Sequence, residues 1–514
     1  NSPDSRRRSF LDVGGRNSIN NFVSSFQRAQ SFSGLNLFEP AIDTIDDISP
    51  LTSPPITNGE FGEPDNNRIF DTLSRHGTES EQINNFEFPQ DENSSLLLGR
   101  QNSKLSNTSE RLISGNSTAP QTIFNSINTL MGIAMLSLPF GFKLCGWILG
   151  TLLLLSSAIV TDYTGKILGK IMRKYPHLTS YGDIANLYGG GKAQFIITLI
   201  FSIDLFGATI SLILIFSDSF SLLFPDISIK VFKSIIIFIL FITSFIPLHI
   251  ISFLSIFGVV CTSGVLIAII VSGLLTREIP GSLLKPASTY LLPDNLNDVL
   301  LSLGIMMAPW GGHIVLPELI KDMKHPSKYS KCCDIAFSFS FALYYLISSV
   351  GFLMEGSNCE DSLIKNIMLN KNNSKSLILI ICSLMGLLSI SKIPLVTRPL
   401  ITVYENLFSL NFETEITYQD GVRQKTFSMK RFIGRVLFTI FILILSFTFT
   451  SFGQVIAFLG SAICFTVCIT LPLLFYLKLF NDELNQLTKL AIKFGILISI
   501  SGAIIGTYSS FVYD

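Results

Sequence analysis

The sequence carries little charge. Only 14% of its 514 residues are Asp, Glu, Lys or Arg, whereas 48% are hydrophobic, and soluble domains usually contain roughly 25% charged residues. Its 37 basic and 37 acidic residues cancel, so no general positive charge recruits a nucleic acid. This composition disfavours a water-soluble fold and predicts a protein whose main partner is a lipid bilayer.

The cysteine spacing typical of metal and redox sites is also missing. None of the eight cysteines forms a C-x-x-C pair, and most lie in apolar stretches, where cysteine behaves as a small hydrophobic residue. Cys332 and Cys333 are adjacent, but no histidine stands beside them at ligand spacing. We therefore predict no metal ligand and no cofactor.

The first 117 residues contain no long apolar run. They are rich in Ser, Asn, Asp, Glu, Pro and Gly, a composition that favours a disordered tail and lacks the apolar core of a cleavable signal peptide. Within this tail, Glu92, Leu96 and Leu97 have the spacing of an acidic dileucine sorting signal, which cytosolic adaptors bind. A chance match is the alternative, because such short patterns are common.

Residues 118–514 carry about eleven apolar segments, each near the length of roughly 20 residues that spans a bilayer as a helix. We predict an all-α polytopic domain with spans at Gln121–Phe142, Gly146–Lys170, Phe195–Ser217, Val231–Leu248, Ser252–Leu275, Val299–Leu319, Ala336–Met354, Leu377–Thr397, Phe432–Thr448, Gln454–Leu477 and Ala491–Val512.

Basic residues in the loops predict the orientation of these spans. Loops after even-numbered spans hold more Lys and Arg than loops after odd-numbered spans, and the richer loops should face the cytosol. The N-terminus is then cytosolic and the C-terminus lumenal. In this orientation Asn372 becomes a glycosylation candidate in a lumenal loop, because Asn373 and Ser374 complete its acceptor motif.

Two spans contain glycine and proline near their middle. The first includes Asn128, Gly132, Ile133 and Ala134; the sixth includes Ala308, Trp310, Gly311 and Gly312. Interrupted helices at matching places in two five-helix halves point to an inverted-repeat transporter with a site near the bilayer midplane. The alternative is that the glycines only permit close helix packing.

The two breaks suggest a site for a zwitterion. Free N–H groups near Gly132–Ala134 would hold a carboxylate with help from the helix dipole, and carbonyls near Ala308–Gly312 would hold an ammonium group. Trp310 would cap an apolar side chain or else serve only in packing. Ile133, Met306 and Met307 favour neutral substrates over charged ones.

Three ionisable residues lie inside apolar spans, where charge is costly and usually functional. Asp204 would carry the coupling proton, or form a structural ion pair or hydrogen bond. Lys392 would occupy the place of a bound sodium ion, or tether helix-end carbonyls. His313 would act as a gate or proton relay, or as a structural donor.

Several motifs together resemble the amino acid/auxin permease family, most closely its fungal vacuolar neutral amino acid transporters, which are related to the vesicular inhibitory amino acid transporters. The resemblance covers about four fifths of the chain. It is carried by Asn125-x-x-Asn128-x-x-x-Gly132, Leu138-Pro139-Phe140-Gly141-Phe142, Gly312-His313 with Pro317, and Lys392-x-x-Leu395-x-x-x-Pro399. Ala134 departs from it, because many relatives have a second glycine there.

The resemblance implies a fold of the bacterial leucine transporter type, with five plus five inverted helices and one extra. It also implies proton-coupled antiport that loads neutral amino acids such as glutamine, leucine, isoleucine or tyrosine into the vacuole. Proton symport out of the organelle and amino acid sensing are the alternatives. An enzyme is disfavoured because no catalytic constellation accompanies His313, and a channel because no filter motif is visible.

Overall fold

The computed structural model describes residues 115–512, with gaps at 246–247, 294, 371, 409, 411–415, 420–421 and 426–428. Nearly all of the predicted N-terminal tail lies outside the described residues. The sorting-signal residues Glu92, Leu96 and Leu97 are among those left outside.

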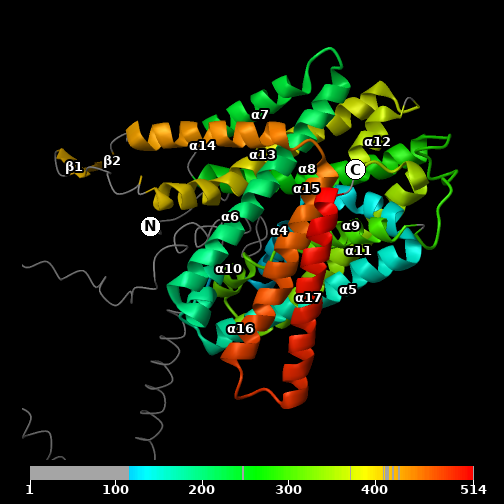
Figure 1. Cartoon of the computed structure of the whole chain (residues 1–514). Helices are drawn as coiled ribbons and strands as arrows, with labels where there is room; N and C mark the ends of the chain where they lie inside the picture. The colour runs from blue at the N-terminus through cyan, green and yellow to red at the C-terminus, as the bar shows by residue number, and fades with distance from the viewer. Residues whose placement is uncertain are drawn as a thin grey trace, which may run out of the picture. The chain divides into compact units, whose positions relative to one another are not determined.

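Helices make up most of the described chain (Figure 1). Their bounds, in chain order, are α4 (Ala119–Leu130), η4 (Ile133–Ser137), α5 (Leu138–Lys174), α6 (Tyr181–Leu223), α7 (Ile229–Thr243), α8 (Leu248–Leu275), α9 (Leu296–Met307), η5 (Ala308–Trp310), α10 (Leu316–Lys321), η6 (Pro326–Lys328), α11 (Tyr329–Glu355), η7 (Gly356–Asn358), α12 (Leu363–Leu369), α13 (Lys375–Leu407), α14 (Met429–Thr448), α15 (Phe452–Phe458), η8 (Leu459–Thr470), α16 (Leu471–Leu479) and α17 (Gln486–Val512). Between α13 and α14, β1 (Ile416–Gln419) pairs antiparallel with β2 (Val422–Lys425).

This order confirms the predicted polytopic helical class. Among the described residues, eight helical stretches are long and apolar enough to cross a membrane. The first predicted span is built from α4, η4 and the start of α5, and the sixth from α9, η5 and α10. With α7 as the fourth span, the elements follow the expected five-plus-five order with α17 as the extra helix.

Local sequence explains where several helices begin and bend. Thr118 starts α4 with a capping box in which its N–H donates to the Gln121 side chain at 2.8 Å. Gly146 has a φ of 70° and divides α5 into the end of the first span and the whole second span. A Cβ at Gly146 would lie 2.7 Å from the main chain of Leu291, so both the kink and this close approach need glycine.

Close backbone packing joins the sixth and tenth spans. A Cβ on Gly304 of α9 would collide with the carbonyl of Ala457, and one on Gly460 would collide with the carbonyl of Gly304. Gly460 lies in η8, a π-helix of 12 residues, and π-helical turns are rare and often lie at functional sites. At Gly304, therefore, glycine serves helix packing.

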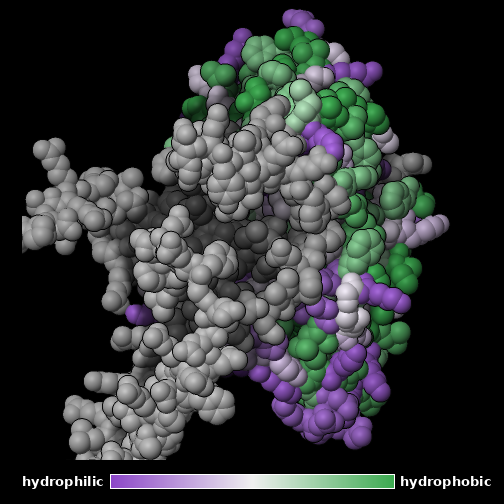
Figure 2. Space-filling model, turned by 90° about the vertical axis from the view of Figure 1, so that its left-hand side faces the viewer, coloured by the Kyte–Doolittle hydropathy of each residue, from purple (hydrophilic) through white to green (hydrophobic). Residues whose placement is uncertain are grey.

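Large apolar side chains cover the outward faces of several spans, as on the flank visible in Figure 2. On α17, Leu497 and Ile504 are 61% and 65% exposed. Such exposure is unfavourable in water and suits acyl chains. The outward surface is therefore the lipid-facing one.

Candidate functional site

The structure places the two predicted breaks against each other. Helix α4 ends at Leu130, and Met131 and Gly132 separate it from η4. Helix η5 ends at Trp310, and residues 311–315 separate it from α10. A Cβ on Gly312 would lie 3.1 Å from the side chain of Leu130, so the breaks in the first and sixth spans are in contact.

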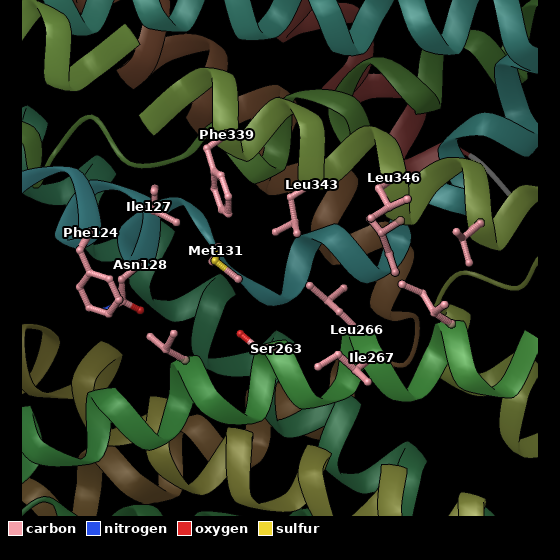
Figure 3. Close-up of a pocket in the computed structure, with 14 residues that line it drawn as sticks. Phe124, Ile127, Asn128, Met131, Ser263, Leu266, Ile267, Phe339, Leu343 and Leu346 are labelled. Atoms are coloured by element: carbon pink, nitrogen blue, oxygen red, sulfur yellow. The ribbon is translucent and has the colours of Figure 1, made fainter. Parts of the chain in front are cut away.

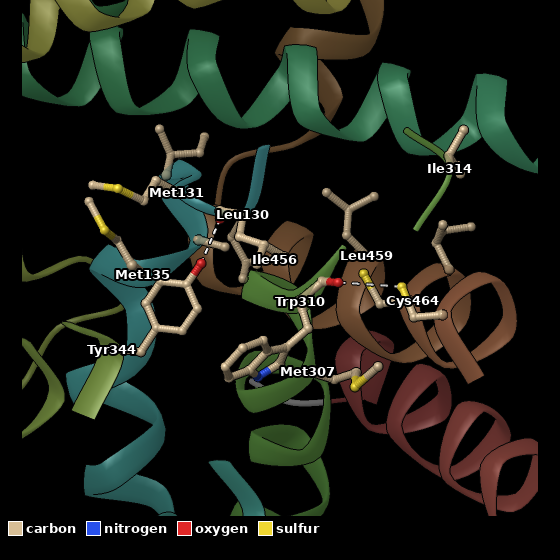
Figure 4. Close-up of a cluster of buried hydrophobic side chains, with 14 of the residues drawn as sticks. Leu130, Met131, Met135, Met307, Trp310, Ile314, Tyr344, Ile456, Leu459 and Cys464 are labelled. Carbon is tan, nitrogen blue, oxygen red and sulfur yellow. Dashed lines mark hydrogen bonds between the residues drawn. The ribbon is translucent and has the colours of Figure 1, made fainter. Parts of the chain in front are cut away.

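Tyr344 of α11 connects the two breaks, and the sequence did not single it out. Its hydroxyl lies 2.6 Å from the carbonyl of Leu130 and 3.2 Å from that of Pro309, so its single proton is shared between the helix ends. The side chain is fully buried (Figure 4). A tyrosine within an apolar span is the signal that points to such a residue, because its hydroxyl needs a partner.

The N–H groups predicted to hold a carboxylate lie at the start of η4, which runs directly into α5. Gly132 precedes them with extended backbone at φ −96° and ψ 177°. The first N–H groups of a helix lack acceptors within it and carry the positive end of its dipole. Ile133 and Ala134, which supply these groups, are both buried.

Most carbonyls predicted to hold an ammonium group already accept hydrogen bonds within the break. The carbonyl of Ala308 accepts from Gly311 N at 3.3 Å, that of Trp310 from Gly312 N at 2.8 Å, and that of Gly312 from Val315 N at 3.1 Å. A carbonyl oxygen has a second lone pair, but the carbonyls of Ala308 and Trp310 also accept from the thiols of Cys464 and Cys468 at 3.8 and 3.5 Å, so an ammonium group would have to replace these weak donors.

Trp310 packs within the core in this structure. Its ring stacks on Phe337 with centroids 5.7 Å apart and meets Tyr344 edge-on at 5.1 Å. The side chain is fully buried, and its Nε1 has no hydrogen-bond partner. These contacts hold the break of the sixth span rigidly against α11.

His313 and Asp204 are brought to the same region by η8. Nε2 of His313 lies 3.0 Å from both the carbonyl of Thr161 and the hydroxyl of Thr164, while its buried Nδ1 has no partner. Cys468 Sγ of η8 lies 3.5 Å from the carbonyl of Trp310, three residues before His313. A Cβ on Gly207, three residues after Asp204, would collide with Leu459 of η8. Two of the three predicted coupling residues therefore lie on segments that contact η8.

Lys392, the third of these residues, reaches a different place. From α13 its Nζ donates a hydrogen bond of 2.5 Å to the carbonyl of Met131, directly after α4. Helix C-terminal ends attract cations. This contact suits both the sodium-like role and the tether predicted for Lys392.

Asn128 is separated from the other predicted binding residues. It lines an apolar cavity bounded by α4, α8 and α11 (Figure 3), whereas Gly132–Ala134 and Gly311–Gly312 lie at the breaks. The glycosylation candidate Asn372 is exposed, between α12 and α13, so an acceptor there is accessible.

A buried acidic residue that the sequence did not single out lies in the sixth span beyond the break. Glu318 of α10 is only 2% exposed, and its Oε2 has no hydrogen-bond partner. Its carboxyl group lies inside the sixth predicted span, where ionisable residues are usually functional, so the sequence could have pointed to it. An unpaired buried carboxyl group is costly when charged, which makes Glu318 a further candidate for binding a proton.

A second missed feature is an ion-pair cluster at the end of the bundle that contains α12. Lys365 of α12 lies 3.0 Å from Asp218 of α6 and 2.9 Å from Asp361, and Asp361 accepts from Gly453 N at 3.0 Å. Burial lowers the pKa of Lys365, but the two carboxylates outweigh it and raise the pKa overall. The cluster therefore fastens α12 to α6 and α15.

The opposite end is closed by contacts between the start of the first span and the end of the sixth. Ser117 N donates to the carbonyl of Asp322 at 2.7 Å, and Lys324 N donates to the carbonyl of Ser117 at 2.8 Å. The side chains of Ser117 and Asp322 are also hydrogen-bonded. The start of the first span is thus held to the end of the sixth by polar contacts.

Two interrupted helices meeting inside a polytopic bundle define a membrane transporter of the inverted-repeat class. A family model described as transmembrane amino acid transporter protein matches residues 115–512, and the chain belongs to this family. Among curated relatives, the Arabidopsis thaliana amino acid transporter AVT1H is 28% identical over 404 residues, covering 77% of this chain and 89% of the relative. The Arabidopsis thaliana amino acid transporter AVT1E is 26% identical over 407 residues, covering 76% and 73%.

Solved structures give more distant matches. The inward-facing conformation of Mhp1 matches with a TM-score of 0.46 at 12% identity, covering 77% of this chain and 89% of Mhp1. A Na+-coupled sialic acid symporter matches with a TM-score of 0.45 at 11% identity, covering 76% and 89%.

Proposed function

We propose that this chain carries neutral amino acids across the vacuolar membrane in exchange for protons. Its family membership and the AVT1 relatives support amino acids as the cargo. The observation that carries the mechanism is the contact between the breaks of the first and sixth spans at Leu130 and Gly312. Two helix breaks in contact offer donors and acceptors at one place within the bilayer.

In this proposal the substrate carboxylate binds the N–H groups of Ile133 and Ala134, and the ammonium group binds carbonyls of residues 308–312. The surrounding side chains support a neutral substrate, because Met306, Met307 and Trp310 are apolar and fully buried. A charged side chain placed among them would lose its hydration without a partner.

Proton coupling falls to the groups that converge on η8. The segments that carry Asp204 and His313 both contact η8, and His313 follows Gly312 directly in the sixth span. A proton taken up by Asp204 or His313 would therefore alter hydrogen bonding at the substrate site. Glu318, buried five residues beyond His313, extends this set.

The vacuolar location and the direction of transport are supported by the resemblance to vacuolar transporters and by the sorting-signal pattern in the tail. An acidic lumen would drive loading by antiport. In the alternative, symport out of the organelle, the same residues would bind a proton and an amino acid that cross the membrane in the same direction. An amino acid sensor would bind substrate at the breaks and signal through the tail.

Coupling is tested by Asp204→Asn in sealed proteoliposomes. We expect loss of proton-driven uptake while exchange of labelled for unlabelled amino acid continues, because exchange needs no net proton movement. Asp226→Asn is the matched control, since Asp226 is exposed in the loop after α6. Unchanged coupling in Asp204→Asn would remove this residue from the mechanism.

A further inference from the structure

The apolar cavity that Asn128 lines lies beside the first span, and none of its described lining residues belongs to the sixth span. It has a volume of about 430 Å³ and is bounded by α4, α8 and α11. Figure 3 shows Ile127 of α4 and Met131, which directly follows α4, facing it, opposite Leu343 of α11 and Leu266 of α8. The cavity therefore reaches the residue at which the first span is interrupted.

The mouth of this cavity opens on the lipid-facing surface. Three of its lining residues, Ile267, Phe339 and Leu346, are 62%, 52% and 48% exposed. They belong to stretches long and apolar enough to cross the membrane, Phe257–Leu275 and Pro326–Asn358. The cavity is thus continuous with the surface that the bilayer covers.

The lining selects hydrocarbon over water and over an amino acid. Asn128 and Ser263 supply its only polar side chains among the described residues, and a buried water needs two to four polar partners. A zwitterionic substrate needs several donors for its carboxylate and several acceptors for its ammonium group, and these two polar side chains do not supply them. The groups available to enter from the bilayer are acyl chains, which suit an apolar wall.

We propose that this cavity binds an acyl chain of a bilayer lipid. The chain enters between α8 and α11 and packs against Ile127 and Met131. The carbonyl of Met131 accepts the hydrogen bond from Lys392, so a bound chain packs against the same residue that Lys392 holds at the end of α4. Any outward movement of α4 between α8 and α11 must then displace this lipid.

The test uses the full chain in vesicles of phosphatidylcholine with a photoreactive diazirine in the middle of one acyl chain. After irradiation, mass spectrometry locates the adducts. We expect adducts on α4 at Ile127 or Met131, as well as on the exposed residues Phe494 and Ile498 of α17. Labelling of α17 without labelling of α4 would overturn the proposal.

Two filling variants, Ser263→Phe and Leu343→Trp, provide independent checks should one of them fold poorly. Each is expected to lose the α4 adducts and keep those on α17. Ser156→Phe is the matched control, since Ser156 is exposed on α5 away from the cavity. Persistent α4 labelling in both folded filling variants contradicts the proposal.

Discussion

The ammonium group of Lys392 donates a hydrogen bond of 2.5 Å to the carbonyl of Met131, 261 positions earlier in the chain. This bond joins α13 to the break of the first span. It places a positive charge at the C-terminal end of α4, where the helix dipole favours a cation.

Replacing Lys392 by Met should therefore lower uptake of neutral amino acids by roughly tenfold or more, because a buried acceptor left unpaired costs about 1–3 kcal/mol. Initial uptake rates in proteoliposomes measure the effect. Lys493→Met is the control, since Lys493 is exposed on α17. Native uptake in Lys392→Met would show that the bond has no role in transport.

The sodium-like role of Lys392 can be separated from the tether with a smaller replacement. In Lys392→Ala the carbonyl of Met131 faces space in which a monovalent cation can sit. Uptake that returns with sodium but not with potassium would support the cation role. A folded variant inactive in both salts would favour the tether.

Tyr344→Phe removes the one hydroxyl shared by the carbonyls of Leu130 and Pro309. We expect a loss of stability of about 1–3 kcal/mol together with slower uptake, because the two breaks lose their common donor. Thermal unfolding in detergent and uptake assays measure the two effects. Tyr345→Phe is the control and should change stability and uptake little, since Tyr345 is 36% exposed beside Tyr344. Equal behaviour of the two variants would contradict the role of the Tyr344 hydroxyl as the bridge between the breaks.

Gly304→Ala should destabilise the protein, because its Cβ would collide with the carbonyl of Ala457 across the packed backbones of α9 and α15. Overpacking of this kind costs about 1–3 kcal/mol. Gly191→Ala is the comparison, since a Cβ there has no atom within 4 Å and alanine favours helix over glycine. Unfolding temperatures that rank Gly304→Ala at or above Gly191→Ala would refute this packing.

Lys365→Gln should loosen the end of the bundle that contains α12. Ion pairs of this partly exposed kind contribute about 1 kcal/mol, or roughly fivefold in an opening equilibrium. Cys359 is a natural reporter, because it is 1% exposed and burial, assisted by Glu355, raises the pKa of its thiol. Opening of this end would bring the thiol into water and increase its thiolate fraction. Its reaction with a water-soluble maleimide would then be faster.

All eight cysteines are buried and carry free thiols. The other seven must therefore be replaced so that only Cys359 can react with the maleimide. Lys375→Gln serves as control because Lys375 is exposed at the start of α13. If both variants leave the labelling rate of Cys359 unchanged, the Lys365 cluster does not close this end of the protein.

The sequence was sufficient to predict most of the helices and the two breaks. Long apolar runs and mid-span glycine and proline carry that information locally, and Gly132 and Gly311 fall where the helices stop. Element α6 starts at Tyr181, but its backbone is non-helical at Gly189 and Gly190, so the apolar helix that follows this kink begins close to the predicted Phe195. The β1–β2 hairpin lies in a polar connection, where Asp420-Gly421, a dipeptide typical of two-residue hairpin turns, was a signal that the apolar pattern does not carry.

The partners of individual side chains could not be predicted in this way. The Tyr344 bridge and the Lys365 cluster each join residues far apart in the chain, and neither hydropathy nor spacing records which helices become neighbours. Asn128 shows the same limit, because its position one turn before Gly132 does not reveal that it faces α8 and α11.

The central claim is proton-coupled transport of neutral amino acids, and uptake into sealed proteoliposomes tests it most directly. Labelled neutral amino acids are supplied under imposed pH gradients of either sign, with and without sodium. The account predicts uptake into vesicles with an acidic lumen that collapses with a protonophore and ignores sodium. Uptake driven only by external acid, or no uptake under any gradient, would contradict it.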